Sequence, residues 1–158
     1  MNTNFFEIER KFLVKDDSFK TMAIAVKVLS QGYLSRDPKR TVRIRICDDK
    51  GYLTIKGETD AAGLSRFEWE KEIPKPEAQA LLGICLPVVI EKERYVVPYE
   101  GMIFEVDVFH GVHEGLVLAE VELRSETQAV TLPPFIGKEV TGNQKYYNSY
   151  LSQMSDNN

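Results

Sequence analysis

The sequence predicts an α+β, mainly β domain in which a few helices pack against one antiparallel sheet. Most of the 158-residue chain alternates apolar and polar side chains with a period of two, which is the pattern of strands. Three stretches instead space their apolar residues by three or four positions, as helices do. The chain, of 18.0 kDa, has the length of one ordinary domain and contains no repeat or linker. We expect one domain over residues 1–154 and a disordered tail over residues 155–158.

The first elements are expected to be a strand, a helix and the start of a second strand. The first strand covers residues 5–14, and because alternate side chains point the same way it gathers three charged residues on one face, Glu7, Glu9 and Lys11. Residues 15–30 are expected to form a helix on the apolar side of the sheet. Its apolar residues are Phe19, Met22, Ala23, Val26 and Leu29. The next strand is expected to begin at Tyr33.

A hairpin and a loop follow. Residues 41–46 and 52–56 alternate on either side of a turn at residues 48–51, which contains two aspartates and a glycine. Residues 60–64, with the sequence DAAGL, are expected to form a loop.

The second half of the chain continues as strands and short helices. Pro74 and Pro76 end the strand that comes after the loop. The last helix carries an apolar stripe of tyrosines. The expected elements are strands at residues 66–73, 88–97, 102–109 and 116–124, and helices at residues 77–82 and 143–154.

The charged face that each strand carries leaves two architectures open. An open sheet would turn this face to water, which is the usual meaning of alternation. A closed barrel would turn it inward, where its carboxylates must pair with bases, bind a metal or stay wet. The pooled strands favour the barrel, since a water-facing surface normally mixes uncharged polar residues with its charges. The in-phase groups are nine carboxylates (Glu7, Glu9, Glu68, Glu70, Glu72, Glu105, Asp107, Glu120, Glu122) and eight bases (Lys11, Arg43, Arg45, Lys56, Arg66, Lys92, Arg94, Arg124).

These charges are segregated by strand, which suggests two ligands. Glu7, Glu9, Glu120 and Glu122 would form an acidic cluster that suits a hard divalent cation, Mg²⁺ or Mn²⁺. Arginines and lysines in number suit a polyanion such as a chain of phosphates. A metal and a phosphate chain are together the parts that phosphoryl transfer needs. The sequence has no P-loop glycine motif, so nucleotide handling of that kind is excluded.

Composition excludes other partners and compartments. The net charge is −4 and the pI is near 5.3, so no chain-wide positive field favours nucleic acid or an anionic membrane. The first eleven residues contain four charged side chains and no signal-peptide core. Cys47 and Cys85 lie 38 positions apart and outline neither a disulfide framework nor a zinc site. We expect a cytoplasmic protein.

The ordered motifs of the chain resemble the CYTH superfamily of triphosphate tunnel metalloenzymes. The start Glu7-x-Glu9-x-Lys11 is similar to its ExExK signature, and the resemblance extends over nearly the whole chain. The further motifs, in order, are QGYL at 31–34, VRIR at 42–45, LTIKG at 53–57, the glutamate strand at 66–72, EKER at 91–94, EVDVF at 105–109, AEVEL at 119–123 and VTGNQKYYN at 140–148.

The resemblance implies a closed, eight-stranded antiparallel tunnel with a charged lumen and helices packed on its outside. It implies that Glu7, Glu9, Glu120 and Glu122 bind Mg²⁺ or Mn²⁺, with Asp107 nearby. It implies that the triphosphate is held by Lys11, Arg43, Arg45, Lys56, Lys92 and Arg94, with Lys145 as a lid-like contact from the last helix. Lys11 would also assist catalysis. Of the in-phase glutamates of residues 66–72, Glu68 and Glu70 are favoured over Glu72 as tunnel carboxylates.

The expected activity is metal-dependent hydrolysis of inorganic tripolyphosphate or a similar organic triphosphate, by attack of a metal-activated water on the terminal phosphorus. Two alternatives stay open, an adenylate cyclase of the class IV type that makes cyclic AMP from ATP, and a noncatalytic barrel that binds polyphosphate or a nucleotide. The expected partner is the small-molecule substrate. Neither nucleic acid nor membrane is expected, and a homodimer is left open.

Overall fold

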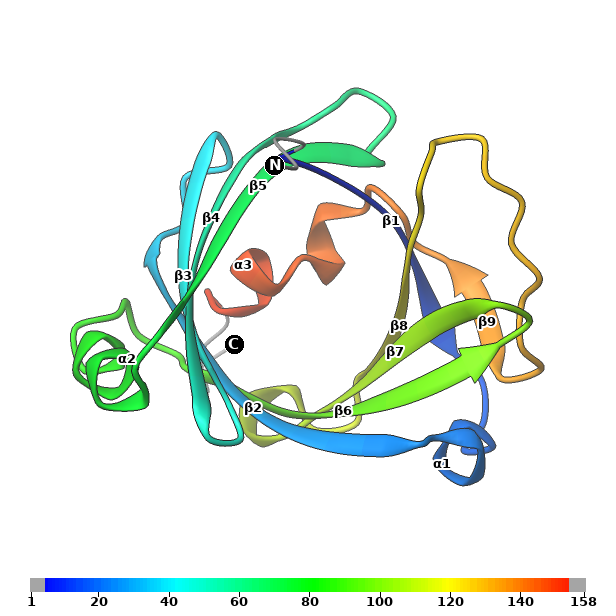
Figure 1. Cartoon of the computed structure of the whole chain (residues 1–158), viewed down its shortest axis with the longest axis horizontal. Helices are drawn as coiled ribbons and strands as arrows, with labels where there is room; N and C mark the ends of the chain where they lie inside the picture. Colours follow the sequence, from blue (N-terminus) through cyan, green and yellow to red (C-terminus); the bar gives the residue numbers. More distant parts are fainter. Residues whose placement is uncertain (1–4, 154–158) are drawn as a thin grey trace.

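In the computed structural model, which describes residues 5–153, the strands form one antiparallel sheet whose two ends meet (Figure 1). The strands are β1 (Phe6–Val14), β2 (Ala25–Ser35), β3 (Arg40–Cys47), β4 (Lys50–Thr59), β5 (Ser65–Ile73), β6 (Ile90–Tyr99), β7 (Met102–Phe109), β8 (Val117–Glu122) and β9 (Ile136–Glu139). The helices are α1 (Phe19–Met22), α2 (Lys75–Leu82) and α3 (Asn148–Leu151), with 3₁₀ turns η1 (Gly111–His113) and η2 (Gln144–Tyr146). Within the described residues no helix has the length and apolar character that crossing a bilayer requires.

Strand β1 closes the barrel because its two halves pair differently. The strand order is β5-β4-β3-β2-β6-β7-β8-β1, and residues 6–8 of β1 pair with β5 while residues 9–13 pair with β8. The short strand β9 pairs with the end of β1 and lies outside this ring of eight. The predicted closed, eight-stranded antiparallel barrel is therefore confirmed, with one additional strand.

The main apolar core lies outside the barrel wall, and this placement turns the charged faces inward. On β1, Phe12 points away from the lumen and is buried with Phe19 of α1 and with Phe135. Outward residues of β6, β7 and β8 complete this cluster, including Val97, Phe104 and Val121. Because side chains alternate along a strand, burying these residues on the outside sends their charged neighbours to the inside.

A second apolar cluster lies at one end of the lumen. It joins Phe109 and Leu118 on the barrel wall to Leu151 of α3. Figure 1 shows α1 and α2 outside the ring of strands and α3 within its outline. The expectation that helices pack on the outside is thus right for α1 and α2 and wrong for α3, whose buried leucine needs the apolar end of the lumen as a partner.

The predicted helix over residues 15–30 is wrong beyond its first turn. Only Phe19–Met22 is helical, and β2 starts at Ala25, well before the expected Tyr33. Val26 and Val28 lie on the outer face and are 48% and 57% exposed, while Leu29 on the inner face is buried. Apolar residues on both faces of a strand hide its period of two and imitate helical spacing.

The C-terminal region also differs from expectation. The predicted helix at residues 143–154 is replaced by η2 and α3, with Tyr147 extended between them, and its end at Met154 lies outside the described residues, as does the predicted tail. Strand β9 was not expected, because four residues carry too little periodicity to reveal a strand that pairs only with β1. The other elements agree with expectation to within a few residues.

Candidate active site in the barrel lumen

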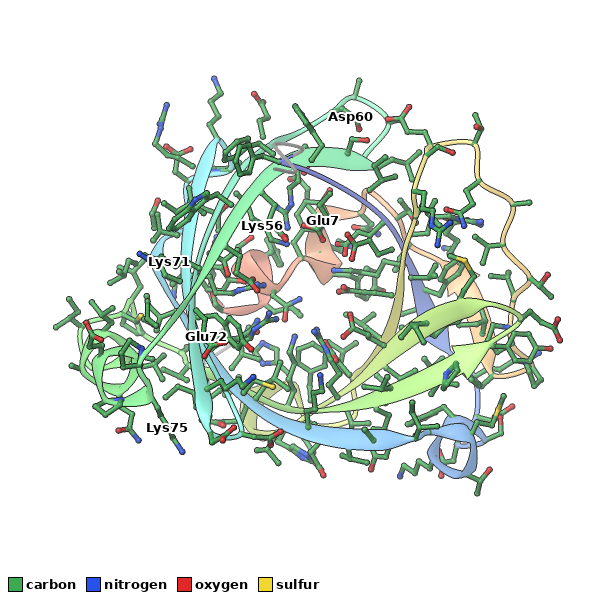
Figure 2. The ribbon with its side chains drawn as sticks, in the orientation of Figure 1. Glu7, Lys56, Asp60, Lys71, Glu72 and Lys75 are labelled. Carbon is green, nitrogen blue, oxygen red and sulfur yellow. The ribbon has the colours of Figure 1, made fainter. Side chains whose placement is uncertain are left out.

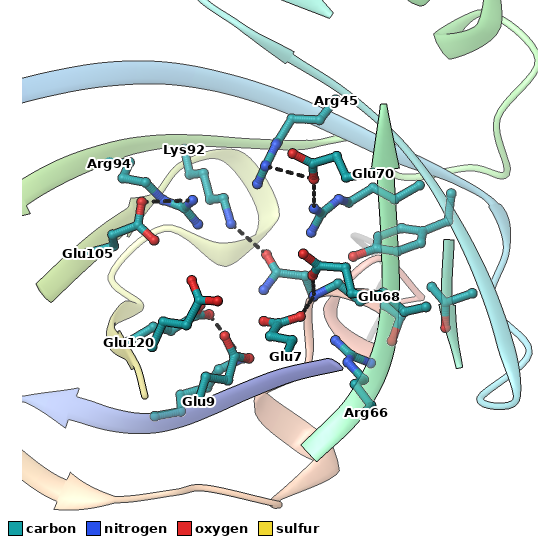
Figure 3. A pocket seen from close by; sticks show the side chains of 18 residues that line it. Glu7, Glu9, Arg45, Arg66, Glu68, Glu70, Lys92, Arg94, Glu105 and Glu120 are labelled. Atoms are coloured by element: carbon teal, nitrogen blue, oxygen red, sulfur yellow. Dashed lines mark hydrogen bonds and ion pairs between the residues drawn. The ribbon is translucent and has the colours of Figure 1, made fainter. Parts of the chain in front are cut away.

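The lumen contains a cavity of about 220 Å³ lined almost entirely by charged and polar side chains. Figure 2 shows Glu7 and Lys56 inside the ring of strands. In Figure 3 the carboxylates of Glu9 and Glu120 face the basic groups of Arg45 and Lys92 across the cavity. The lining residues are Glu7, Glu9, Lys11, Tyr33, Thr41, Arg43, Arg45, Lys56, Arg66, Glu68, Glu70, Lys92, Arg94, Glu105, Glu120, Glu122, Asn148 and Ser149.

Neighbouring strands β1 and β8 supply the acidic side of the cavity. Glu9 lies directly opposite Glu122 in the strand register, a pairing of like charges that destabilises a sheet unless something compensates it. Burial raises the pKa of Glu9 well above its usual value, and the charges of Glu120 and Glu7 raise it further. Burial also raises the pKa of Glu122, with Glu7 and Glu105 adding to the effect. The negative charge on this side is therefore incompletely balanced.

Two lysines, Lys56 and Lys11, form ion pairs with the acidic side. Lys56 Nζ on β4 lies 2.9 Å from a Glu7 oxygen and 3.1 Å from a Glu68 oxygen. Burial opposes the charge of Glu7, but Lys56 and hydrogen bonds with Glu68 and Glu9 outweigh it and hold the pKa of Glu7 well below its usual value. Burial, then the hydrogen bond to Glu7, raises the pKa of Glu68 to about 7.

Lys11 holds the other end of the acidic side. Its ammonium lies 3.3 Å from a Glu120 oxygen and donates a 3.0 Å hydrogen bond to the carbonyl of Tyr146. Burial lowers the pKa of Lys11, but the charges of Glu120 and Glu9 outweigh burial and leave it raised. Burial acts against the charge of Glu120 as well, yet Lys11 and Arg94 bring the pKa of Glu120 down to about 2. Lys11 therefore stays charged inside the lumen.

Strands β3 and β6 supply the basic side. Arg43 and Arg45 each approach the same Glu70 oxygen at 3.5 Å, so one carboxylate is shared between two guanidinium groups. Burial and then the neighbouring charges of Arg43 and Arg94 lower the pKa of Arg45 to about 10. Positive charge is thus in excess here, which is the condition that attracts a polyanion.

Asp107 anchors this basic side instead of joining the glutamates. It is 2% exposed, lies 2.8 Å from Lys92 Nζ, and accepts two hydrogen bonds from Arg94, at 2.7 and 2.9 Å. It does not line the cavity. Strand β7 places Asp107 opposite Arg94 in the register, although its charge still acts on Glu120. Its expected place near the metal ligands stays a prediction.

Of the remaining expected residues, some line the lumen cavity and others do not. Glu68 and Glu70 line the cavity and Glu72 does not, as favoured from the sequence. Lys145, expected as a lid-like contact, does not line the lumen cavity and instead lies on η2 beside a separate surface cavity with Val112 and Glu114.

Six lining residues were missing from the predicted site. Thr41, Arg66 and Glu105 share the phase of charged strand residues, so that signal could have included them. Tyr33 could not be found this way because most of β2 was expected to be a helix. Asn148 and Ser149 could not be found because their positions depend on how α3 enters the barrel. Asn148 accepts 2.8 Å hydrogen bonds from both Lys92 Nζ and Gln31 Nε2.

Comparison with known proteins assigns this barrel to a family. A family model described as the CYTH domain matches residues 6–155. The chain belongs to the CYTH domain family. Two similar CYTH proteins bear the name inorganic triphosphatase. The one from Acetivibrio thermocellus is 48% identical over 146 residues, covering 92% of each chain, and the one from Nitrosomonas europaea is 38% identical over 152 residues, covering 92% of this chain and 96% of its own.

Solved structures agree with this assignment. The crystal structure of an inorganic triphosphatase is 34% identical, with a TM-score of 0.65 over 94% of this chain and 99% of its own. A putative adenylyl cyclase from Hippeastrum, 17% identical with a TM-score of 0.60 over 75% of this chain, shares the fold.

The donor chemistry of this CYTH barrel fits a divalent cation. The carboxylate oxygens of Glu9 and Glu122 are hard donors, and a cation bound to them would offset the burial and the neighbouring negative charges that raise both pKa values. Over residues 5–153 no three carboxylate, imidazole or thiol groups already form a ready-made metal cluster. A metal held here would take its remaining ligands from phosphate oxygens and water, which is how Mg²⁺ is usually bound.

Proposed function

We propose that this CYTH domain hydrolyses a triphosphate inside its lumen with the help of Mg²⁺ or Mn²⁺, and that inorganic tripolyphosphate is the preferred substrate. The observation that carries the proposal is the presence, in one cavity, of an acidic side from β1 and β8 and a basic side from β3 and β6. The names of the two similar CYTH proteins support the choice of substrate.

The basic residues bind and orient the phosphate chain in this proposal. Arg43 and Arg45 present guanidinium forks that match phosphate oxygens, and the bound phosphate would replace the single Glu70 carboxylate they now share. Lys56, Lys92 and Arg94 add positive charge from β4 and β6. Because ion pairs already hold these groups in the lumen, binding exchanges carboxylate partners for phosphate oxygens and needs little movement of the basic side chains themselves.

The acidic residues and Lys11 act at the reacting end. Glu7, Glu9, Glu120 and Glu122 would hold the metal, which when bound neutralises phosphate charge and activates water. Lys11 is charged and fixed by Glu120, so its ammonium stabilises the charge that develops on the phosphoryl oxygens. In this proposal the acidic side therefore serves catalysis and the basic side serves substrate binding.

An organic triphosphate is a second candidate because a larger cavity adjoins the lumen. This cavity of about 440 Å³ shares Thr41, Arg66 and Ser149 with the lumen. An organic group attached to the last phosphate would lie there.

The cytoplasm is the proposed compartment, in agreement with the free thiols of Cys47 and Cys85.

Phosphate release from tripolyphosphate, ATP and thiamine triphosphate tests the proposal, with Mg²⁺, with Mn²⁺ and with a chelator. We expect metal-dependent release that is fastest with tripolyphosphate. Cyclic AMP and pyrophosphate from ATP would instead indicate a cyclase, and binding without turnover of any of the three would indicate a noncatalytic barrel. Either of these results contradicts the proposal.

Substrate affinity without metal should depend on pH through Lys92. Burial lowers the pKa of Lys92 to about 8, against the opposing charge of Asp107 and with a further lowering by Arg94. The protonated amine is the form that attracts phosphate, so affinity is gained below pH 8 and lost as the pH rises through it. We expect a loss of about tenfold or more, the worth of one charge-assisted hydrogen bond.

Calorimetric titration with tripolyphosphate in chelator, between pH 7 and 9.5, measures this loss. Lys92→Arg is the control, since a guanidinium stays charged over the whole range. Its affinity relative to wild type should rise with pH. A constant ratio between the two proteins would exclude Lys92 as the titrating group.

A further inference from the structure

The ring of Tyr147 contacts two cations of the lumen at once. Lys11 Nζ lies 5.6 Å from the centroid of the ring and the guanidinium carbon of Arg66 lies 5.7 Å from it. Both distances are within the range at which a cation is attracted to an aromatic face. Lys11 and Arg66 line the lumen cavity, whereas Tyr147 does not. Tyr147 instead lines the adjoining cavity of about 440 Å³ together with Arg66. The effect of the ring on a phosphate chain in the lumen therefore passes through the two cations.

The Lys11 ammonium has contacts with Glu120, with the carbonyl of Tyr146 and with the ring of Tyr147. The ammonium has three donors, of which one is directed to Glu120 and one to the carbonyl of Tyr146. With these two contacts alone, the ammonium could still shift its position within the lumen. The Tyr147 ring adds a third point of attraction without consuming a hydrogen-bond donor, so one N–H of Lys11 remains for a phosphate oxygen.

Arg66 depends on the ring even more. It lies opposite Glu7 in the β1–β5 register, yet among residues 5–153 it forms no ion pair within 4.0 Å. A guanidinium facing the lumen without a carboxylate partner is available for an anion. Its five donors also lose less conformational freedom on binding when a flat aromatic ring already fixes its plane.

The backbone around Tyr147 fixes the ring in turn. Tyr147 is extended between η2 and α3, and its carbonyl accepts the first helical hydrogen bond of α3, from Leu151 N at 2.9 Å. Leu151 is buried in the apolar end of the lumen, and Asn148 is hydrogen-bonded to Lys92. The ring is thus attached to a segment that is anchored on both its apolar and its polar side.

We propose that Tyr147 is a positioning residue for catalysis, whose ring holds Lys11 and Arg66 at a set separation so that both cations reach the same end of the phosphate chain. This inference rests on the proposed function. Lys11 would act on the reacting phosphoryl group and Arg66 on binding, so the ring couples the two.

Replacement of the ring tests the proposal. Tyr147→Phe keeps the aromatic face and should stay within about twofold of wild type in kcat and KM for tripolyphosphate. Tyr147→Leu and Tyr147→Met remove the face at similar volume, and should each lower kcat and raise KM, with a loss in kcat/KM of about tenfold or more. Tyr150→Leu, on the next turn of the same segment, is the matched control and should behave as wild type.

Two further measurements separate positioning from a structural role. Calorimetric titration with tripolyphosphate in chelator should show weaker binding for Tyr147→Leu and Tyr147→Met but not for Tyr147→Phe, while thermal unfolding verifies that each variant is folded. In an Arg66→Ala background, Tyr147→Leu should cost less than in wild type, because one of its two partners is gone. Additive losses, or a Phe variant as impaired as the Leu variant, would overturn the proposal. Absence of activity in the wild type would refute the proposed function, whereas an active Tyr147→Leu variant with normal kcat/KM would refute this inference alone.

Discussion

Glu9→Gln is expected to abolish metal-dependent hydrolysis while leaving the protein as stable as wild type or more stable. Without a metal, burial and the charges of Glu120 and Glu7 favour the neutral form of Glu9, which glutamine imitates in shape and charge. A divalent cation needs the carboxylate instead, so the variant loses a ligand. We expect kcat/KM to fall by at least about a hundredfold, since metal-supplied charge stabilisation is worth several kcal/mol.

The opposite signs of the two effects make this prediction specific. Wild-type stability in chelator should fall as the pH rises, because the raised pKa of folded Glu9 favours the protonated state, and the variant should show a flatter profile. Thermal unfolding and phosphate release on the same preparations measure both effects. Glu91→Gln, on the outer face of β6 where Glu91 bonds Ser30, should change neither. A fully active Glu9→Gln would remove Glu9 from the metal site.

Asp107→Ala is expected to cause the largest loss of stability among single replacements of lumen residues. The carboxylate neutralises both Lys92 and Arg94, and its removal leaves two buried positive charges without their main partner. Breaking a buried ion pair from one side typically costs about 3 to 5 kcal/mol. In a chain of this length such a loss lowers the unfolding midpoint by roughly 10 °C or more.

The pH dependence of this effect has a defined sign. Burial raises the pKa of Asp107, but Arg94 and Lys92 outweigh it and hold that pKa below the unfolded value, so the stabilisation is present above about pH 4 and is lost as the pH falls further. Calorimetric unfolding at pH 7 and at about pH 2 measures it. Glu93→Gln, whose carboxylate pairs with His110 at a half-exposed position, is the control and should cost less than about 1 kcal/mol. An Asp107→Ala midpoint within 2 °C of wild type at pH 7 would contradict the anchoring role.

The site could largely be predicted from the sequence because alternate residues of a strand lie on the same face, so the spacing of the charged residues shows which of them lie together. Glu7, Glu9 and Lys11 share a face of β1 whatever surrounds them, and closing the sheet sends that face inward with Arg43 and Arg45 of β3. The phase alone could not say that Asp107 would be fully consumed by Arg94 and Lys92, since this depends on the register between β6 and β7.

The parts that escaped prediction depend on contacts between distant segments. Val26 and Val28 of β2 point outward without cover, and Leu29 is on the inner face, so neither face of the strand is uniformly polar or apolar. The entry of α3 into the lumen is set by Leu151 meeting Phe109 and Leu118. The entry of α3 places Asn148 against Lys92 and also sets the position of Tyr147. The residue pattern of a single segment does not predict these contacts.

The central claim is that the two sides of the lumen hold a metal ion and a phosphate chain together. Its most direct test is a crystal structure of the protein with Mn²⁺ and a tripolyphosphate analogue whose bridging oxygens are replaced by nitrogen, with manganese located by its anomalous scattering. We expect manganese beside Glu9, Glu120 and Glu122 and phosphate oxygens on Arg43, Arg45 and Lys56. Manganese or phosphate bound outside the barrel, with Glu9 and Glu122 unchanged side by side on β1 and β8, would contradict it.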